Sequence, residues 1–196
     1  IVYPNMYTRE FEDSDFYGNN QGRVIRFAGN DGFVYIYSEY YPGAEVAGKI
    51  EKYSSGNMLV ETKWFYSDGS VKKIVKSDGS LMEFDASGNL TREVKSDGHE
   101  YTYDASGRIT STLTPAGLYY EDILNAPENP DRITRVIYSS KNKTTLVKTE
   151  IYSYSDPMDY TTWTLVSIIM PDGHTINYDG VGRVESEIVP GSYSVD

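Results

Sequence analysis

The feature that most constrains the fold of this chain is an internal repeat of 19 residues. Residues 76–94 (KSDGSLMEFDASGNLTREV) and 95–113 (KSDGHEYTYDASGRITSTL) are identical at 9 of 19 positions, and residues 170–188 (MPDGHTINYDGVGRVESEI) match the second copy at 8 of 19. Each copy contains an Asp-Gly pair and a second glycine nine residues after the first. Glycine adopts the positive φ that hairpin turns require, and Asp hydrogen-bonds nearby backbone groups, so each copy is predicted to contain two turns.

The residues between the turns have the pattern of short strands. About six residues separate successive turns, which is a typical strand length. Apolar and polar residues alternate, as in an antiparallel sheet that is wet on one side. We therefore predict one buried face, which carries Met82, Phe84, Leu90, Val94, Tyr101, Tyr103, Ile109 and Leu113.

Turn signals of the same kind lie on both sides of the repeats, for example at Pro42-Gly43, Ser55-Gly56-Asn57 and Asp68-Gly69. No long stretch of changed composition divides the 196 residues, a length that suits one β-domain. The expected fold class is all-β. We predict a single domain over residues 1–196, an antiparallel meander of tandem hairpins whose sheet curls over one core.

The second half of each repeat also resembles a known family. The string Tyr103-Asp104-Ala105-Ser106-Gly107-Arg108-Ile109-Thr110, echoed at residues 84–91 and 178–184, is similar to the YD repeat of Rhs and teneurin-type proteins. It also resembles YD-like uncharacterised secreted lipoproteins of Bacteroidetes. The resemblance implies a bacterial protein that is extracellular, or periplasmic and outer-membrane associated, with a scaffolding or binding role and no catalytic residues to transfer. A lipid anchor upstream of Ile1 is compatible with it.

Composition argues against several classes of function. The formal net charge of −11 repels the phosphate backbone, so no nucleic-acid partner is expected. The chain has no cysteine, which excludes disulfides and thiolate metal sites. No apolar run is long enough to form a transmembrane helix. No cofactor is expected.

The polar residues that could form a catalytic or metal site have structural explanations. His99 and His174 occupy the same repeat position, directly after an Asp-Gly turn, so we expect both to be structural and predict no metal site. The Asp13-Ser14-Asp15 segment begins like a calcium loop, but Val24 stands where such a loop needs Glu. We interpret the repeated Asp85, Asp104 and Asp179 as turn formers.

Aromatic residues are the best candidates for binding. Trp64, Phe65 and Tyr66 are consecutive, so alternation must place neighbours on opposite faces of the sheet. Another cluster comprises Tyr35, Tyr37, Tyr40 and Tyr41. We predict ligand-binding residues at Trp64, Tyr66 and Trp163, although cross-strand packing would also explain them.

Three hypotheses of function follow. The leading one is a non-catalytic interaction or scaffold module at the bacterial cell surface or in the periplasm, with an unknown protein or glycan partner. The second is a carbohydrate-binding domain that uses exposed Tyr and Trp side chains. The third is a glycoside hydrolase with paired carboxylates, since the 29 acidic residues offer many pairs.

Overall fold

The computed structural model describes residues 8–11, 24–38, 48–124, 131–156 and 158–191. The chain divides into two compact units, unit 1 (Ile1–Ser96) and unit 2 (Asp97–Asp196), and each is described by itself below. In the described residues of both units the regular structure is β-strand, apart from one short 3₁₀ helix. The prediction of an all-β fold is confirmed.

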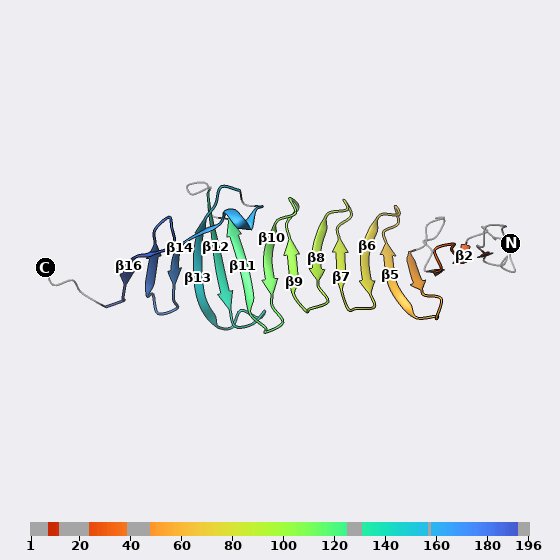
Figure 1. The fold of residues 1–196 in the computed structure, drawn as a ribbon, viewed down its shortest axis with the longest axis horizontal. Helices are drawn as coiled ribbons and strands as arrows, with labels where there is room; N and C mark the ends of the chain where they lie inside the picture. Colours follow the sequence, from red (N-terminus) through yellow and green to blue (C-terminus); the bar gives the residue numbers. More distant parts are fainter. Residues whose placement is uncertain (1–7, 12–23, 39–47, 125–130, 157, 192–196) are drawn as a thin grey trace. The chain divides into compact units, whose positions relative to one another are not determined.

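Unit 1 contains the strands β1 to β8, which follow one another in the sheet in sequence order (Figure 1). Their bounds are β1 Thr8–Phe11, β2 Val24–Ala28, β3 Val34–Ser38, β4 Lys49–Tyr53, β5 Leu59–Phe65, β6 Val71–Lys76, β7 Leu81–Phe84 and β8 Leu90–Val94.

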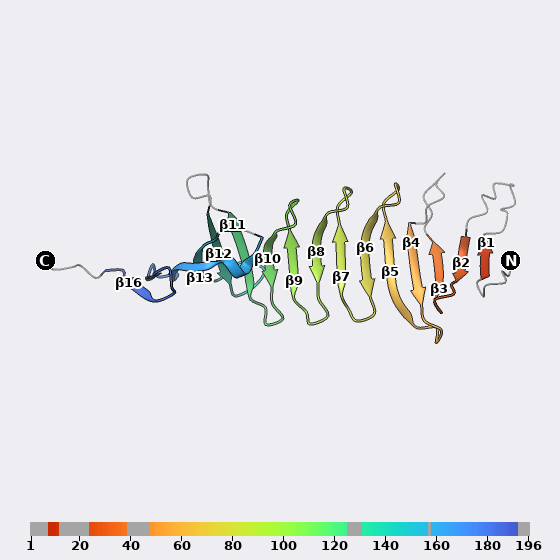
Figure 2. The same ribbon diagram turned by 45° about the horizontal axis from the view of Figure 1, so that its top comes forward.

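Unit 2 contains the strands β9 to β16, also in sequence order (Figures 1 and 2). Their bounds are β9 Glu100–Tyr103, β10 Ile109–Leu113, β11 Tyr119–Leu124, β12 Arg132–Tyr138, β13 Leu146–Ser153, β14 Thr164–Ile169, β15 Thr175–Tyr178 and β16 Val184–Ile188. The 3₁₀ helix η1 (Tyr160–Thr162) lies in the connection between β13 and β14.

Within each unit every described strand pair is antiparallel and joins strands that are consecutive in the sequence. Neither set of strands closes into a barrel. The predicted meander of tandem hairpins is therefore confirmed. The predicted turn at Pro42-Gly43 and the Asp13–Asp15 segment lie outside the described residues.

The repeat turns share one hydrogen-bonded geometry. In the β7–β8 turn, the Asp85 N–H donates to the Asn89 carbonyl at 2.9 Å, and the Gly88 N–H donates to the Asp85 carbonyl at 3.0 Å. Gly88 has φ of +84°, in the left-handed region. The Asp85 carboxylate oxygen Oδ1 also accepts from the N–H groups of Ser87 and Asn89. Asp104 and Asp179 accept in the same way, so all three are turn formers.

The β4–β5 turn differs at one position. Its left-handed residue is Asn57, with φ of +61°, whereas Gly56 has no positive φ. Asparagine is among the few residues besides glycine that tolerate this conformation. The turn that the sequence predicted at Ser55-Gly56-Asn57 is present, with asparagine at its left-handed position.

The predicted buried face is wrong in one respect, because a β-bulge follows each turn of the Asp85 type. In the β7–β8 pair, Phe84 lies opposite Leu90 while Glu83 lies opposite Arg92, so β8 carries one extra residue. Residues directly opposite in antiparallel strands share a face. Val94, opposite Leu81, is therefore on the other face from Met82, whose partner is Glu93.

The other two copies have the same bulge. Leu113 pairs with Glu100 and lies on the opposite face from Tyr101 and Tyr103. Ile188 likewise pairs with Thr175, on the opposite face from Ile176. The residues predicted to form the buried face are all only half-buried: Met82, Phe84, Leu90, Val94, Tyr101, Tyr103, Ile109 and Leu113.

The fully buried apolar side chains among the described residues are Ile133 and Ile137, with 1% and 4% of their surface exposed. Both lie on β12, four residues apart, and therefore on one face of the sheet. The β13–β14 connection passes over this face, as Figure 1 shows for η1 near β11 and β12. Unit 2 thus has a small core beneath a connecting segment.

The left-handed glycines give a testable prediction for stability. Gly88→Ala should lower the free energy of unfolding by about 1 kcal/mol, because a Cβ is strained at positive φ even where space is available. A Cβ on Gly88 would meet nothing within 4 Å, so conformation alone causes the loss. The control is Gly56→Ala, which should change stability by less than about 0.5 kcal/mol. Urea unfolding followed by circular dichroism measures the stability of both variants. Equal losses of stability in Gly88→Ala and Gly56→Ala would contradict the turn assignment.

The turn aspartates give a prediction for pH dependence. The Asn89 side chain and backbone N–H hold the pKa of Asp85 below the ordinary value of 3.8, and the backbone N–H and guanidinium of Arg183 lower the pKa of Asp179. A depressed pKa in the folded chain stabilises it above pH 3.8, and this contribution is lost as the pH falls below that value.

The urea midpoint should therefore fall between pH 5 and pH 3, as expected for carboxylates with ordinary unfolded pKa values of about 4. In an Asp85→Asn, Asp179→Asn double variant the midpoint should be lower at pH 7 and should change less on acidification. A variant with the same acid sensitivity as the parent would show that these carboxylates are not responsible.

Candidate functional site

One hollow on unit 1 is a shallow groove on one face of its sheet, with a volume of about 270 Å³. Residues from β3, β4 and β5 and from the start of β6 line it. We call it the Tyr35 groove; it comprises Tyr35, Tyr37, Ile50, Lys52, Glu61, Lys63, Phe65 and Val71.

The strand register explains why these side chains meet. Tyr37 lies opposite Ile50, and Ile50 lies opposite Lys63 on the next strand. One step along, Tyr35, Lys52 and Glu61 form a parallel row. Because opposite residues share a face, both rows point to the same side. A bulge then places Phe65 opposite Val71, which closes one end of the groove with apolar surface.

The charged groups that line the groove are already partnered. Lys52 Nζ is 3.9 Å from the Phe33 ring centroid and 5.6 Å from that of Tyr35, within cation–π range. Lys63 Nζ is 3.1 Å from Glu61 Oε1. The groove therefore combines aromatic and aliphatic side chains with charged groups of both signs.

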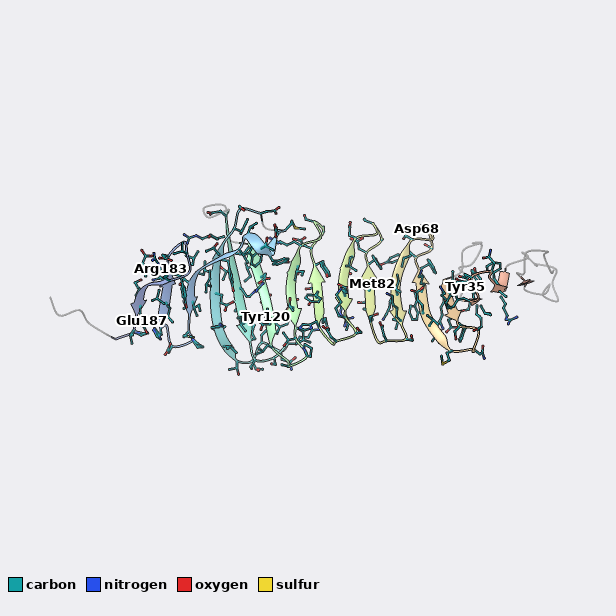
Figure 3. The ribbon with its side chains drawn as sticks, viewed as in Figure 1. Tyr35, Asp68, Met82, Tyr120, Arg183 and Glu187 are labelled. Atoms are coloured by element: carbon teal, nitrogen blue, oxygen red, sulfur yellow. The ribbon has the colours of Figure 1, made fainter. Side chains whose placement is uncertain are left out.

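Tyr35, which is labelled in Figure 3, is fixed by its hydrogen bond to a turn. Its hydroxyl donates to Asp31 Oδ2 at 2.6 Å. This bond raises the pKa of Tyr35 to about 12 and lowers the pKa of Asp31. At neutral pH the phenol remains protonated and the carboxyl ionised, so the pair holds the ring in place and is unsuited to proton transfer. A second hollow of about 210 Å³ shares Tyr35 and Tyr37 and extends to Phe27 and Gly29.

Two of the predicted binding residues lie in unit 1 but outside the groove. Trp64 pairs with Lys49 and Lys73, on the opposite face from Phe65, and Lys73 Nζ is 5.7 Å from its ring. The alternation predicted for these consecutive aromatics is present. The hydroxyl of Tyr66 donates to the Phe84 carbonyl at 2.9 Å, which ties the end of β5 to β7.

The third predicted residue, Trp163, lies in unit 2 against a half-buried arginine. Its ring centroid is 5.3 Å from the Arg135 guanidinium carbon. It is also 5.7 Å from the Tyr152 ring and 4.7 Å from the Tyr160 ring, so this indole packs against the sheet and η1. In the described structure Trp163 does not form an open aromatic platform.

Arg135 is the centre of a polar cluster on the face that also carries Ile133 and Ile137. Arg135 donates from Nε and Nη2 to the two oxygens of Asp122, at 2.7 and 2.8 Å. Asp122 lies opposite Arg135 on β11, and Glu150 lies opposite it on β13. Both carboxylates are buried, at 7% and 9% exposed. Burial is the largest influence on the Arg135 pKa and lowers it, but the bonds to Asp122 give a net increase, so the guanidinium stays charged.

The remaining acceptor of the cluster is also occupied. Tyr152 donates its hydroxyl to Glu150 Oε2 at 2.7 Å, and Lys148 Nζ is 2.7 Å from Glu150 Oε1. Burial and this hydrogen bond raise the pKa of Tyr152. Every charged group of the cluster thus has a partner. The cluster fixes the β13–β14 connection to the sheet and is not arranged for acid–base chemistry.

The histidines occupy equivalent places, as their repeat position predicted. The N–H groups of His99 and His174 donate to the turn carboxylates of Asp97 and Asp172 at 3.0 and 2.9 Å. Across the parts of the chain that the structure describes, no three His, Asp or Glu side chains come together as a metal site. Nor does any helix there have the length and apolarity needed to span a membrane.

Comparison with known proteins identifies the repeat. A family model described as RHS Repeat matches residues 84–118. This segment contains the Tyr103–Thr110 motif, so the chain carries a repeat of the Rhs type, as the sequence predicted. Comparison with curated proteins gives no significant match.

The similarity to solved structures is distant. The TCP10 domain of Danio rerio CPAP in complex with a peptide of Danio rerio STIL has a TM-score of 0.48 and 18% identity, over 95% of this chain and 91% of that one. The TcdB2-TccC3-Cdc42 structure has a TM-score of 0.30 and 9% identity, over 95% of this chain and 14% of that one. The Photorhabdus luminescens Tc holotoxin pore has a TM-score of 0.23 and 10% identity, over 88% and 14%.

The Arg135 cluster gives a prediction for stability. Arg135→Met should lower the free energy of unfolding by about 3 kcal/mol, because it leaves the Asp122 carboxylate buried without a counter-charge. The double variant Asp122→Leu, Arg135→Met should lose less free energy of unfolding than the single variant Arg135→Met.

The fluorescence of Trp163, measured in a Trp64→Phe background, should shift to the red in Arg135→Met as the indole becomes exposed. An unshifted spectrum would mean that Trp163 is held in place without Arg135.

Proposed function

We propose that this chain is a non-catalytic interaction module that binds a protein partner through the Tyr35 groove. The observation that carries the proposal is the groove itself, a hollow on an open sheet that is lined by aromatic and aliphatic side chains together with charged groups of both signs. Protein interfaces combine aromatic anchors with polar and charged groups in the same way. The strands hold the side chains in place, so little ordering entropy is lost on binding.

The absence of catalysis is part of the proposal, and the electrostatics support it. Tyr35 and Asp31 are held in their ordinary protonation states by their mutual hydrogen bond. Glu61, which lines the groove, is paired with Lys63. Neither Tyr35 nor Asp31 is poised to exchange a proton near neutral pH.

Carbohydrate binding is the second candidate, because Tyr35 and Tyr37 line both hollows of this face and tyrosine rings can stack on sugars. We also propose that the protein is located at the bacterial cell surface or in the periplasm, and the Rhs-type repeat supports this location. An anchor of the kind found in YD-like lipoproteins is one way in which such a module would be attached.

The test uses a phage-displayed random peptide library and a glycan array against the whole chain. We expect enriched peptides to bind saturably and Phe65→Ala to weaken their binding by about tenfold or more, as for an interface anchor. Trp64→Ala is the matched control, since it removes the neighbouring aromatic side chain from the opposite face and should leave affinity unchanged. Circular dichroism confirms that both variants are folded.

Three results would contradict the proposal. Equal losses of peptide affinity in Phe65→Ala and Trp64→Ala would show that binding does not involve the groove face. Binding of glycans alone, lost in Phe65→Ala, would favour the carbohydrate hypothesis. Turnover of a bound glycan would show that the chain is an enzyme.

A further inference from the structure

The charges on the face that carries the Tyr35 groove indicate what kind of partner fits it. Lys52 lies opposite Glu61 in the β4–β5 pair, and Lys76 lies opposite Glu61 in the β5–β6 pair. Because opposite residues share a face, all three side chains are on the groove side of the sheet. Lys63 is two residues from Glu61 on β5 and shares this face. Glu61 is thus next to three lysines on one side of the sheet.

This arrangement leaves more positive than negative charge at the groove. Glu61 is engaged by one of the lysines, since Lys63 Nζ is 3.1 Å from its Oε1. Lys52 contacts two aromatic rings, which carry no net charge. Among the described residues neither Lys52 nor Lys76 forms an ion pair, and Lys76 is exposed. Two ammonium groups are therefore available to carboxylates of a partner.

Two turn carboxylates adjoin these strands, but both are engaged within their own hairpins. The Asp31 carboxylate accepts from the Phe33 N–H and the Tyr35 hydroxyl. Asp78 Oδ1 accepts from the N–H and the hydroxyl of Ser80. The excess of lysine on this face contrasts with the whole chain, whose formal net charge is −11. The groove is therefore a local reversal of the charge of the protein.

We propose that the Tyr35 groove binds an acidic segment of its partner protein, in which glutamate or aspartate residues flank an aromatic or aliphatic side chain. The apolar side chain would contact Phe65 and Val71, which line the groove. The carboxylates would pair with Lys52 and Lys76. This inference rests on the function proposed above and adds the chemistry of the partner. The net charge of the chain opposes acidic ligands, so binding of one depends on this local group of lysines.

Three synthetic peptides with the same apolar centre test the proposal on the whole chain by fluorescence anisotropy. They are Glu-Glu-Phe-Leu-Phe-Glu-Glu and the same peptide with glutamine or with lysine in place of glutamate. We expect the glutamate peptide to bind about tenfold more tightly than the glutamine peptide, as two partly exposed ion pairs would give. The lysine peptide should bind most weakly, although the net charge of the chain favours it. Added salt should weaken binding of the glutamate peptide, because it screens the ion pairs.

Charge variants locate the ion pairs. Lys76→Gln should weaken binding of the glutamate peptide about threefold and leave the affinity of the glutamine peptide unchanged. The matched control is Lys73→Gln on the same strand, which should affect neither peptide because Lys73 pairs with Trp64 on the opposite face. Glu61→Gln removes a carboxylate that repels the glutamate peptide and should strengthen its binding about threefold. Circular dichroism confirms that the variants are folded.

The outcomes separate this inference from the function on which it rests. Equal binding of all three peptides, lost in Phe65→Ala, would keep the groove as a binding site and overturn the acidic partner. Binding of the glutamate peptide that neither Phe65→Ala nor Lys76→Gln weakens would place the peptide elsewhere and overturn both proposals. Failure of the glutamate peptide to bind would overturn the acidic segment. Binding of polygalacturonate in its place, lost in Phe65→Ala, would show that the ligand is an acidic glycan.

Discussion

The hairpin turn is the interaction on which the rest of this structure depends. In each unit the described strands form a single layer, and Ile133 and Ile137 are the fully buried apolar side chains among the described residues, so these layers gain little from a hydrophobic core. Each hairpin must therefore be specified largely by its own residues. The left-handed glycine sets the chain direction, and the aspartate carboxylate binds the backbone N–H groups that the reversal leaves exposed. Because the contacts within each hairpin are local, the same turn residues can specify successive hairpins along the chain.

The same turns explain how far the sequence predicts the fold. The glycine spacing and the alternation of apolar residues were sufficient for the strands and their antiparallel order, because both depend on residues close together in the chain. The face of each residue was not predictable by alternation alone, since one bulge reverses it. Val94 and Leu113 show this: each is four residues after an apolar partner in β8 or β10, yet pairing places it on the other side. The position of a bulge depends on how the turn closes, which the period of the pattern does not reveal.

The candidate site was only partly predictable for a related reason. Tyr35 and Tyr37 stood out as neighbouring aromatics, but the predicted binding residues were Trp64, Tyr66 and Trp163. Register then decided which rings meet: Phe65 joins the groove, whereas Trp64 is one residue away on the opposite face. Trp163 could not be placed from the sequence, because its contact with Arg135 joins residues that are far apart in the chain. The row of Asp122, Arg135 and Glu150 depends on the same long-range pairing.

The aromatic residues have different roles in the two units, and this difference bears on function. In unit 2, Trp163 and Tyr152 surround a fully paired arginine, so their surface stabilises a connection and is not available to a ligand. In unit 1, Tyr35 and Tyr37 line an open hollow on a sheet face. A repeat that folds by local contacts leaves its faces free to vary without loss of the fold. Such a sheet is suited to recognition, because residues on its faces can change while the turns that define it remain the same.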